Sequence, residues 1–174
     1  MREFADDPAI EERIADPLCE TDATVATAES CTGGLIGSYL TDVPGSSEYF
    51  DRTLATYSYD AKLELVGVAR ETLDEHGAVS EPVARQMARG VRDTANTTWG
   101  LSTTGIAGPD GGSDRKPVGT VFVGVAYRGD WGTQDSFARV RRYEFDGTRL
   151  EVKEQIARRA LSDLLTAVEG KRDQ

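Results

Sequence analysis

Residues 28–34 read Ala-Glu-Ser-Cys-Thr-Gly-Gly, and this segment decides how the rest of the chain is organised. The residues before it, 24–28, are β-branched or apolar and predict a buried strand. Residues 35–40 follow it and predict a helix, so the segment forms a strand-to-helix turn. Such a turn directs backbone N–H groups and the positive end of a helix dipole toward one place. Ser30 in this position is a candidate nucleophile.

Two interpretations of this turn are open. In the first, backbone N–H groups beside Ser30 stabilise an oxyanion, and the substrate contacts the next residues of the turn, Cys31, Thr32, Gly33 and Gly34. In the second, Thr32 only caps the helix, the two glycines let the helix pack closely on the strand, and Ser30 has no chemical role. Cys31 is a competing nucleophile, and it points elsewhere if Ser30 faces the site.

The composition predicts one α/β domain over residues 1–170 and a disordered tail over residues 171–174. The chain has 20 basic and 30 acidic residues, a net charge of −10, and 39% hydrophobic residues. This charge disfavours a general nucleic-acid binder, because phosphates would be repelled. An acidic surface with few lysines also suits adaptation to high salt, and an ordinary acidic protein is the alternative.

Neither a membrane segment nor a metal site is predicted. The chain has no apolar run of membrane-spanning length and its acidic N-terminus is unlike a signal peptide, so we expect a cytoplasmic protein without membrane contact. Cys19 and Cys31 are too few for a secreted disulfide scaffold and are expected to be reduced thiols. His76 is assigned a structural role in the last turn of a helix, and no zinc-binding spacing is present.

The order of the predicted elements is α-β-α-β-α-α-β-β-β-α. The strands are predicted at residues 24–28, 52–57, 99–104, 121–127 and 135–145. The last two follow one another through a short turn and form an antiparallel hairpin. Helices connect the others, which predicts a three-layer α/β/α fold with a mixed, mainly parallel sheet. At the N-terminus, Ile10, Ile14 and Leu18 have the spacing of an amphipathic helix, and the last helix is predicted to begin with a capping box at Thr148 and to end by Gly170.

Two later residues are candidates to complete a serine site. Tyr57 ends the second predicted strand, and Lys62 lies in the first turn of a short helix for which Asp60 is the predicted cap. A lysine near a helix N-terminus is electrostatically disfavoured, which lowers its pKa toward a neutral amine that can act as a base. A solvated surface lysine is the alternative for Lys62. Tyrosine can relay a proton or donate to an oxyanion, but spacing alone does not show that these side chains meet Ser30.

A glycine-rich segment over residues 105–112 follows the third predicted strand, and Lys116 comes shortly after it. Backbone N–H groups in such a segment can wrap a ligand. The segment matches neither the P-loop pattern nor the dinucleotide-binding glycine pattern. A mobile surface loop is the alternative interpretation.

Five blocks of sequence, taken in order, closely resemble the CinA C-terminal domain family, which includes nicotinamide-nucleotide amidohydrolases. The blocks read AESCTGG at 28–34, TDVPGSS at 41–47, TYS at 56–58, HGAVS at 76–80, and TGIAGPDGG at 104–112 with KPVGT at 116–120. A weaker sixth block, FDGTR at 145–149, precedes the last predicted helix. The resemblance covers residues from about 20 to 127.

The resemblance implies hydrolysis of the carboxamide of nicotinamide mononucleotide, which gives nicotinic acid mononucleotide and ammonia. It implies Ser30 as the nucleophile, Tyr57 and Lys62 as the other catalytic residues, no cofactor, no metal, and a homo-oligomer. The anionic substrate then needs a local positive pocket, which Arg52, Lys62 and Lys116 are expected to supply. The segment that begins at Thr104 and Gly105 is expected, with Lys116, to hold the ribose and phosphate.

The chain departs from the family pattern at Tyr59, where relatives commonly carry a small polar residue. Tyr59 is expected to add bulk near the site, which bears on substrate fit rather than on the chemistry. A CinA-like module that binds a nucleotide or senses it without hydrolysing it is therefore the alternative function. The complete set of Ser30, Tyr57 and Lys62 argues against that alternative.

Overall fold

One mixed sheet of five strands forms the centre of the computed structural model, which describes residues 3–173. The strands stand in the order β2-β1-β3-β4-β5. Their bounds are β1 Val25–Glu29, β2 Phe50–Ala55, β3 Trp99–Gly105, β4 Thr120–Tyr127 and β5 Phe137–Glu144. β1 pairs parallel with β2 and β3, whereas β4 pairs antiparallel with β3 and β5. The predicted hairpin of β4 and β5 is confirmed, and the antiparallel pairing extends one strand further, to β3.

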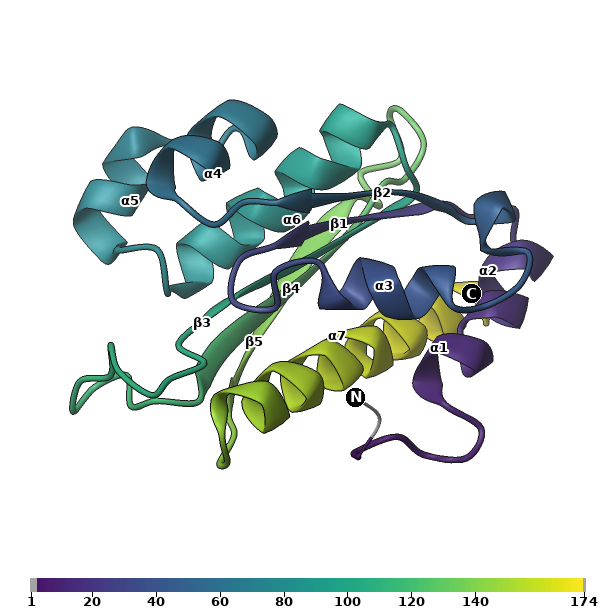
Figure 1. Ribbon diagram of the computed structural model, residues 1–174. Helices are drawn as coiled ribbons and strands as arrows, with labels where there is room; N and C mark the ends of the chain where they lie inside the picture. The colour runs from purple at the N-terminus through teal and green to yellow at the C-terminus, as the bar shows by residue number, and fades with distance from the viewer. Residues whose placement is uncertain (1–2, 174) are drawn as a thin grey trace.

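Helices cover both faces of this sheet and produce the three layers expected from the sequence (Figure 1). On one face lie α3 Leu35–Thr41 and the long α7 Arg149–Arg172, with the short α1 Ile10–Arg13 and α2 Ala15–Glu20 packed against α7. On the other face lie α4 Tyr59–Val66, α5 Arg70–His76 and α6 Glu81–Ala95. A single 3₁₀ turn, η1 Ser46–Glu48, leads into β2. None of the helices in residues 3–173 is long and apolar enough to span a membrane.

Each face of the sheet has its own apolar cluster. Buried residues of α7, such as Ile156 and Leu161, pack in one cluster with Leu101 of β3. On the other face, α6 approaches the sheet closely at Gly100 of β3, which carries no side chain. A Cβ at Gly100 would lie 2.1 Å from the carbonyl oxygen of Ala88, so any larger residue there would push α6 off the sheet.

Because β1 pairs parallel with β2 and β3, the carboxyl ends of these three strands lie together at one end of the sheet. The segment of residues 28–34 follows β1, Tyr57 follows β2, and the glycine-rich segment follows β3. In open α/β sheets, ligands bind at the carboxyl ends of such strands. The fold therefore gathers the predicted site residues from three separate blocks of sequence.

Several predicted boundaries are wrong, and local hydrogen bonds explain some of them. β2 begins and ends earlier than residues 52–57, so Tyr57 lies beyond the strand. Ser58, not Asp60, caps α4, because its hydroxyl oxygen accepts a hydrogen bond from the Ala61 N–H at 3.0 Å. The predicted N-terminal helix is divided into α1 and α2, although the predicted apolar residues Ile10, Ile14 and Leu18 are all buried.

The predicted capping box of α7 is confirmed at Thr148 and Glu151. The helix continues past its expected end at Gly170 to Arg172, so the first two residues of the predicted tail are helical. Gln174, the last residue of that tail, lies outside the described residues. Both cysteines are free thiols, as expected: Cys19 is exposed and Cys31 is buried.

Candidate active site

Ser30 lies directly after β1, at the start of the turn that leads into α3. Its backbone N–H donates to the carbonyl oxygen of Thr103 at 2.9 Å, which ties the turn to the neighbouring strand β3. Thr32 adds a second link, because its hydroxyl lies 2.8 Å from the hydroxyl of Thr103. The turn is completed by Gly33 and Gly34, both at positive φ (63° and 97°), where other residues would be strained.

The fully buried carboxylate of Glu29 caps α3, a role that was not predicted. Its two oxygens accept hydrogen bonds from the N–H groups of Gly34 at 2.9 Å, Ile36 at 3.2 Å and Gly37 at 2.9 Å. The prediction that Thr32 caps this helix is wrong, because Gly34 occupies the cap position without a side-chain bond. The positive end of the α3 dipole thus faces Glu29 and not an approaching substrate.

By contrast, the turn before α3 keeps free donors. Among residues 3–173, the N–H groups of Thr32 and Gly33 have no protein acceptor. Free backbone N–H groups next to a nucleophile are the usual components of an oxyanion hole.

The side chain of Lys62, on α4, extends to Ser30 at the carboxyl end of β1. It is fully buried, and its Nζ lies 3.1 Å from the Oγ of Ser30. The same Nζ lies 2.6 Å from the carbonyl oxygen of Thr56 and 3.2 Å from that of Tyr57. The alternative of a solvated surface lysine is therefore wrong.

Burial lowers the pKa of Lys62 from 10.5 to about 8. The partners of its Nζ are a hydroxyl and two carbonyls, none of which carries the negative charge that would restore a high pKa. A lysine of this kind is partly neutral near physiological pH and has a lone pair available for a proton.

Burial has the opposite effect on Cys31 beside it and raises the pKa of the thiol to about 12. A thiol with that pKa stays protonated near neutral pH, so it is a poor nucleophile. Of the two candidate nucleophiles in the turn, only Ser30 has a base within hydrogen-bonding distance.

Tyr57 lies near Ser30 and Lys62, but its hydroxyl is not hydrogen-bonded to either of them. Its side chain is 67% exposed, and among residues 3–173 its hydroxyl has no hydrogen-bond partner. The link from Tyr57 to Lys62 runs through the backbone carbonyl instead. A direct proton relay from Ser30 through the Tyr57 hydroxyl is thus not present in this conformation.

A cleft of about 240 Å³ opens beside Ser30 and Lys62. Of the predicted substrate-binding residues, Cys31, Thr104 and Gly105 line it. One part of its wall is apolar and is formed by Ala78, Val79, Ile106 and Ala107, whereas Asp110 and Arg149 are charged residues of its lining.

Five predicted substrate-binding residues are not among those that line this cleft, namely Thr32, Gly33 and Gly34 of the turn, and Arg52 and Lys116. Arg52 is on β2, where it forms an ion pair with Asp51. Lys116 donates through its Nζ to the carbonyl oxygen of His76 at 3.3 Å.

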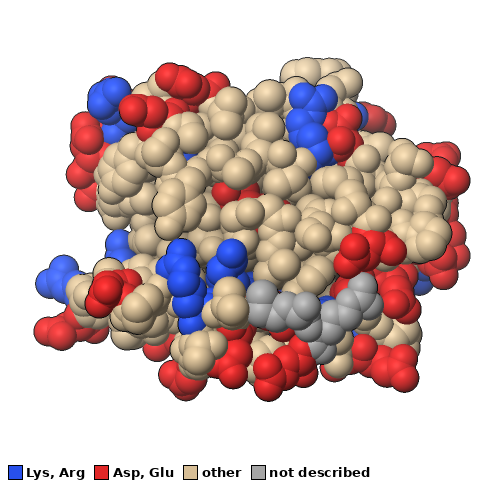
Figure 2. Space-filling view, in the orientation of Figure 1, with Lys and Arg blue, Asp and Glu red and all other residues tan. Residues whose placement is uncertain are grey.

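A different cation lines the cleft, and it was not among the predicted site residues. Arg149, the first residue of α7, donates to the carbonyl oxygen of Gly108 in the glycine-rich segment. Lys153 follows one turn later, and its Nζ lies 3.8 Å from where a Cβ of Gly33 would stand. Figure 2 shows basic side chains gathered where the glycine-rich segment meets the start of α7, while acidic side chains dominate the margins of this face.

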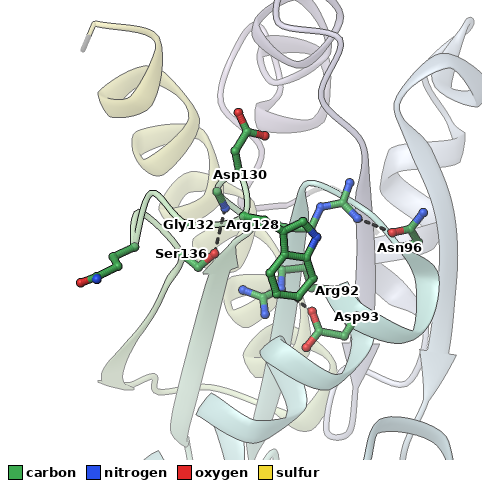
Figure 3. Close-up of a pocket in the computed structure, with 10 residues that line it drawn as sticks. Arg92, Asp93, Asn96, Arg128, Asp130, Gly132 and Ser136 are labelled. Carbon is green, nitrogen blue, oxygen red and sulfur yellow. Dashed lines mark hydrogen bonds and ion pairs between the residues drawn. The ribbon is translucent and has the colours of Figure 1, made fainter.

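A larger cavity than this cleft, of about 750 Å³, lies at the opposite end of the sheet. It lies between the end of α6 and the connection from β4 to β5, with Arg92, Arg128 and Asp130 among its lining residues (Figure 3). Its arginines are already paired, Arg92 with Asp93 and Arg128 with Asn96. None of the predicted site residues lines this cavity, so the smaller cleft at Ser30 is the candidate active site.

Known proteins that resemble the chain carry the name CinA-like protein or competence-damage inducible protein. A family profile described as "CinA C-terminal domain" matches residues 7–168. A "CinA-like protein" from Chlorobium limicola is 48% identical over 161 residues, which cover 92% of this chain and 37% of that protein. A "CinA-like protein" from Syntrophus aciditrophicus is 56% identical over 121 residues, which cover 70% of this chain and 29% of that protein. The chain thus spans well under half the length of these relatives.

Solved structures of similar length have the same fold. The competence/damage inducible protein from Agrobacterium tumefaciens is 38% identical with a TM-score of 0.84, over 92% of this chain and 93% of that one. A CinA superfamily protein from Escherichia coli is 30% identical with a TM-score of 0.84, over 94% of this chain and 92% of that one. On the combined agreement of sequence and fold, the chain belongs to the CinA C-terminal domain family.

Proposed function

We propose that the chain is an amidohydrolase that converts nicotinamide mononucleotide and water into nicotinic acid mononucleotide and ammonia. The observation that carries the proposal is the pairing of Ser30 with a buried lysine, Nζ to Oγ at 3.1 Å, whose pKa is lowered to about 8. Hydrolases that lack a histidine base use such a lysine to activate serine.

The contacts of Lys62 suit a base in its neutral form. A neutral amine has two N–H donors and one lone pair. The two donors match the carbonyl oxygens of Thr56 and Tyr57, which leaves the lone pair for the O–H of Ser30. The backbone thus orients the amine toward the nucleophile.

In the proposed first step, the Oγ of Ser30 attacks the amide carbon as Lys62 takes its proton. The developing oxyanion accepts hydrogen bonds from the free N–H groups of the turn after Ser30. Lys62 then gives its proton to the amide nitrogen, the C–N bond breaks, and ammonia leaves. In the second step, Lys62 deprotonates a water that attacks the acyl-enzyme, which releases the carboxylate and restores the Ser30 hydroxyl.

The shape of the cleft supports a flat amide bound beside Ser30, with the ribose and phosphate at the mouth. A volume of about 240 Å³ is small for a whole nucleotide, whereas the apolar part of its wall suits an aromatic ring. Arg149 and Lys153 at the start of α7 are proposed to hold the phosphate in place of Arg52 and Lys116. Tyr57, exposed at the mouth, is proposed to cover the bound ring.

Ammonia release from nicotinamide mononucleotide tests the proposal. We expect Ser30→Ala to lower the rate by at least about a thousandfold without unfolding the protein. Ser38→Ala, at an exposed position on α3, is the matched control and should retain the wild-type rate. Retained turnover by Ser30→Ala would refute the proposal. A wild type that binds the nucleotide but releases no ammonia would instead indicate a non-catalytic binding module.

The homo-oligomeric state and the cytoplasmic location stay predictions. Light scattering of the purified protein measures the first, and fractionation of the source cells measures the second. A monomer that turns over the substrate would show that one chain completes the site.

A further inference from the structure

The last residue of α5, His76, and the connection that follows it, residues 77–80, are held in place by side chains from three other parts of the fold. The Tyr59 hydroxyl of α4 accepts a hydrogen bond from the Ala78 N–H at 3.2 Å. The Thr104 hydroxyl of β3 donates to the carbonyl oxygen of Ala78 at 2.7 Å. Lys116 donates to the carbonyl oxygen of His76 at 3.3 Å. The connection lacks regular structure of its own, so these bonds fix its position.

This connection forms part of the candidate active site. Ala78 and Val79 line the cleft together with Ser30 and Lys62. Their small apolar side chains offer a surface against which a flat ring can lie beside the nucleophile. A shift of this backbone by a fraction of an ångström would change the width of the cleft without touching Ser30 or Lys62.

Tyr59 links this wall to the helix that carries the lysine. Tyr59 and Lys62 are three residues apart on α4, so they lie on neighbouring turns of one side of the helix. The Tyr59 side chain is half exposed and is not among the residues that line the cleft. Tyr59 thus places its bulk behind the Ala78 wall and not inside the cleft.

We propose that Tyr59 is a positioning residue, which sets the fit of the aromatic amide by holding the Ala78–Val79 wall at a fixed distance from Lys62. This inference rests on the proposed function, since it concerns the substrate of that site. Thr104 holds the same wall from the other side, through the carbonyl of Ala78. The Thr104 hydroxyl thus fixes the position of the wall and does not bind the substrate directly.

The test compares Tyr59→Phe with the wild type in ammonia release from nicotinamide mononucleotide. Loss of one hydrogen bond should raise KM roughly two- to tenfold and leave kcat within about twofold. Thr104→Val removes the second bond to Ala78 and should change KM in the same direction. Tyr127→Phe, which removes a hydroxyl from β4 at the far end of the sheet, is the matched control. Hydrogen exchange should be faster at residues 77–80 in Tyr59→Phe and Thr104→Val, and unchanged in Tyr127→Phe.

The outcomes separate this inference from the proposed function. A raised KM in Tyr59→Phe with wild-type values in Tyr127→Phe supports it, whereas an unchanged KM, or a fall in kcat alone, overturns it. If the wild type releases no ammonia, the proposed function fails. The role of Tyr59 is then tested by the dissociation constant for the same nucleotide. Weaker binding by Tyr59→Phe then supports the role of Tyr59, while equal binding, or none in the wild type, overturns it.

Discussion

The protonation state of Lys62 controls the proposed chemistry, because only the neutral amine can take the proton of Ser30. Its pKa is lowered to about 8 by burial. We expect kcat/KM to rise about tenfold per pH unit below that value and to level off above it, since kcat/KM reports the ionisation of the free enzyme. Ammonia release measured from about pH 6 to about pH 10 checks this profile. A plateau that begins below about pH 6 would contradict Lys62 as the base.

The same burial makes Lys62 costly for stability. Its pKa is 10.5 when solvated and about 8 in the fold, so below pH 8 both states are protonated and the folded state carries the full penalty. The penalty fades as the pH rises from about 8 to about 10.5. We expect Lys62→Met to raise the free energy of unfolding by about 1–2 kcal/mol at pH 7, less than the shift alone implies, because the Thr56 carbonyl loses its donor.

Urea unfolding of the wild type and Lys62→Met at several pH values measures this difference. The gain of the variant should fall as the pH rises from about 8 and become a loss near pH 10.5, because the unpaired Thr56 carbonyl then remains without a charge penalty to offset it, while ammonia release should be lost at every pH. A gain that stays constant with pH would show that packing, not charge, causes it.

At the scale of the element, the turn between β1 and α3 depends on one buried carboxylate. Glu29 accepts three N–H groups of α3 and thereby fixes the turn that carries Ser30. We expect Glu29→Gln to lower the free energy of unfolding by about 1–3 kcal/mol, since the amide offers one acceptor where the carboxylate offers two. It should also lower kcat at least about tenfold, because Ser30 loses its alignment with Lys62.

Thermal unfolding and ammonia release measure the two effects of Glu29→Gln. Glu169→Gln, at an exposed position near the end of α7, is the control and should change neither. Wild-type stability in Glu29→Gln would show that water replaces the lost acceptor.

Most helices and strands could be predicted from periodicity, because the apolar residues of the buried face recur at a regular spacing along each of them. The strand β4, for example, begins one residue before its predicted start and ends at its predicted end. The errors in the predicted bounds and caps occur where a single capping or long-range hydrogen bond determines how a helix or strand begins or ends. Glu29 reaches five to eight residues ahead to cap α3, and no local pattern in the sequence marks a glutamate that ends a buried strand as a cap.

The site was predictable as a set of residues but not as an arrangement. Ser30 and Lys62 meet across 32 residues of sequence, which the parallel order of the strands brings about. Arg149 reaches the cleft from the far end of the chain. Arg52 and Lys116 do not line the cleft, and charge alone could not have shown which way these side chains face.

At the scale of the whole molecule, the net charge of −10 acts against compactness. Salt shortens the range of this repulsion, from about 10 Å at 0.1 M to about 3 Å at 1 M. We expect the melting temperature to rise when KCl increases from about 0.1 M to about 2 M. Over the same range KM for the anionic nucleotide should also rise, because salt screens Arg149 and Lys153 as well. Sucrose, which is excluded from protein surfaces but does not screen charge, is the control. An equal gain in sucrose, or a melting temperature that falls with KCl, would rule out charge repulsion as the cause.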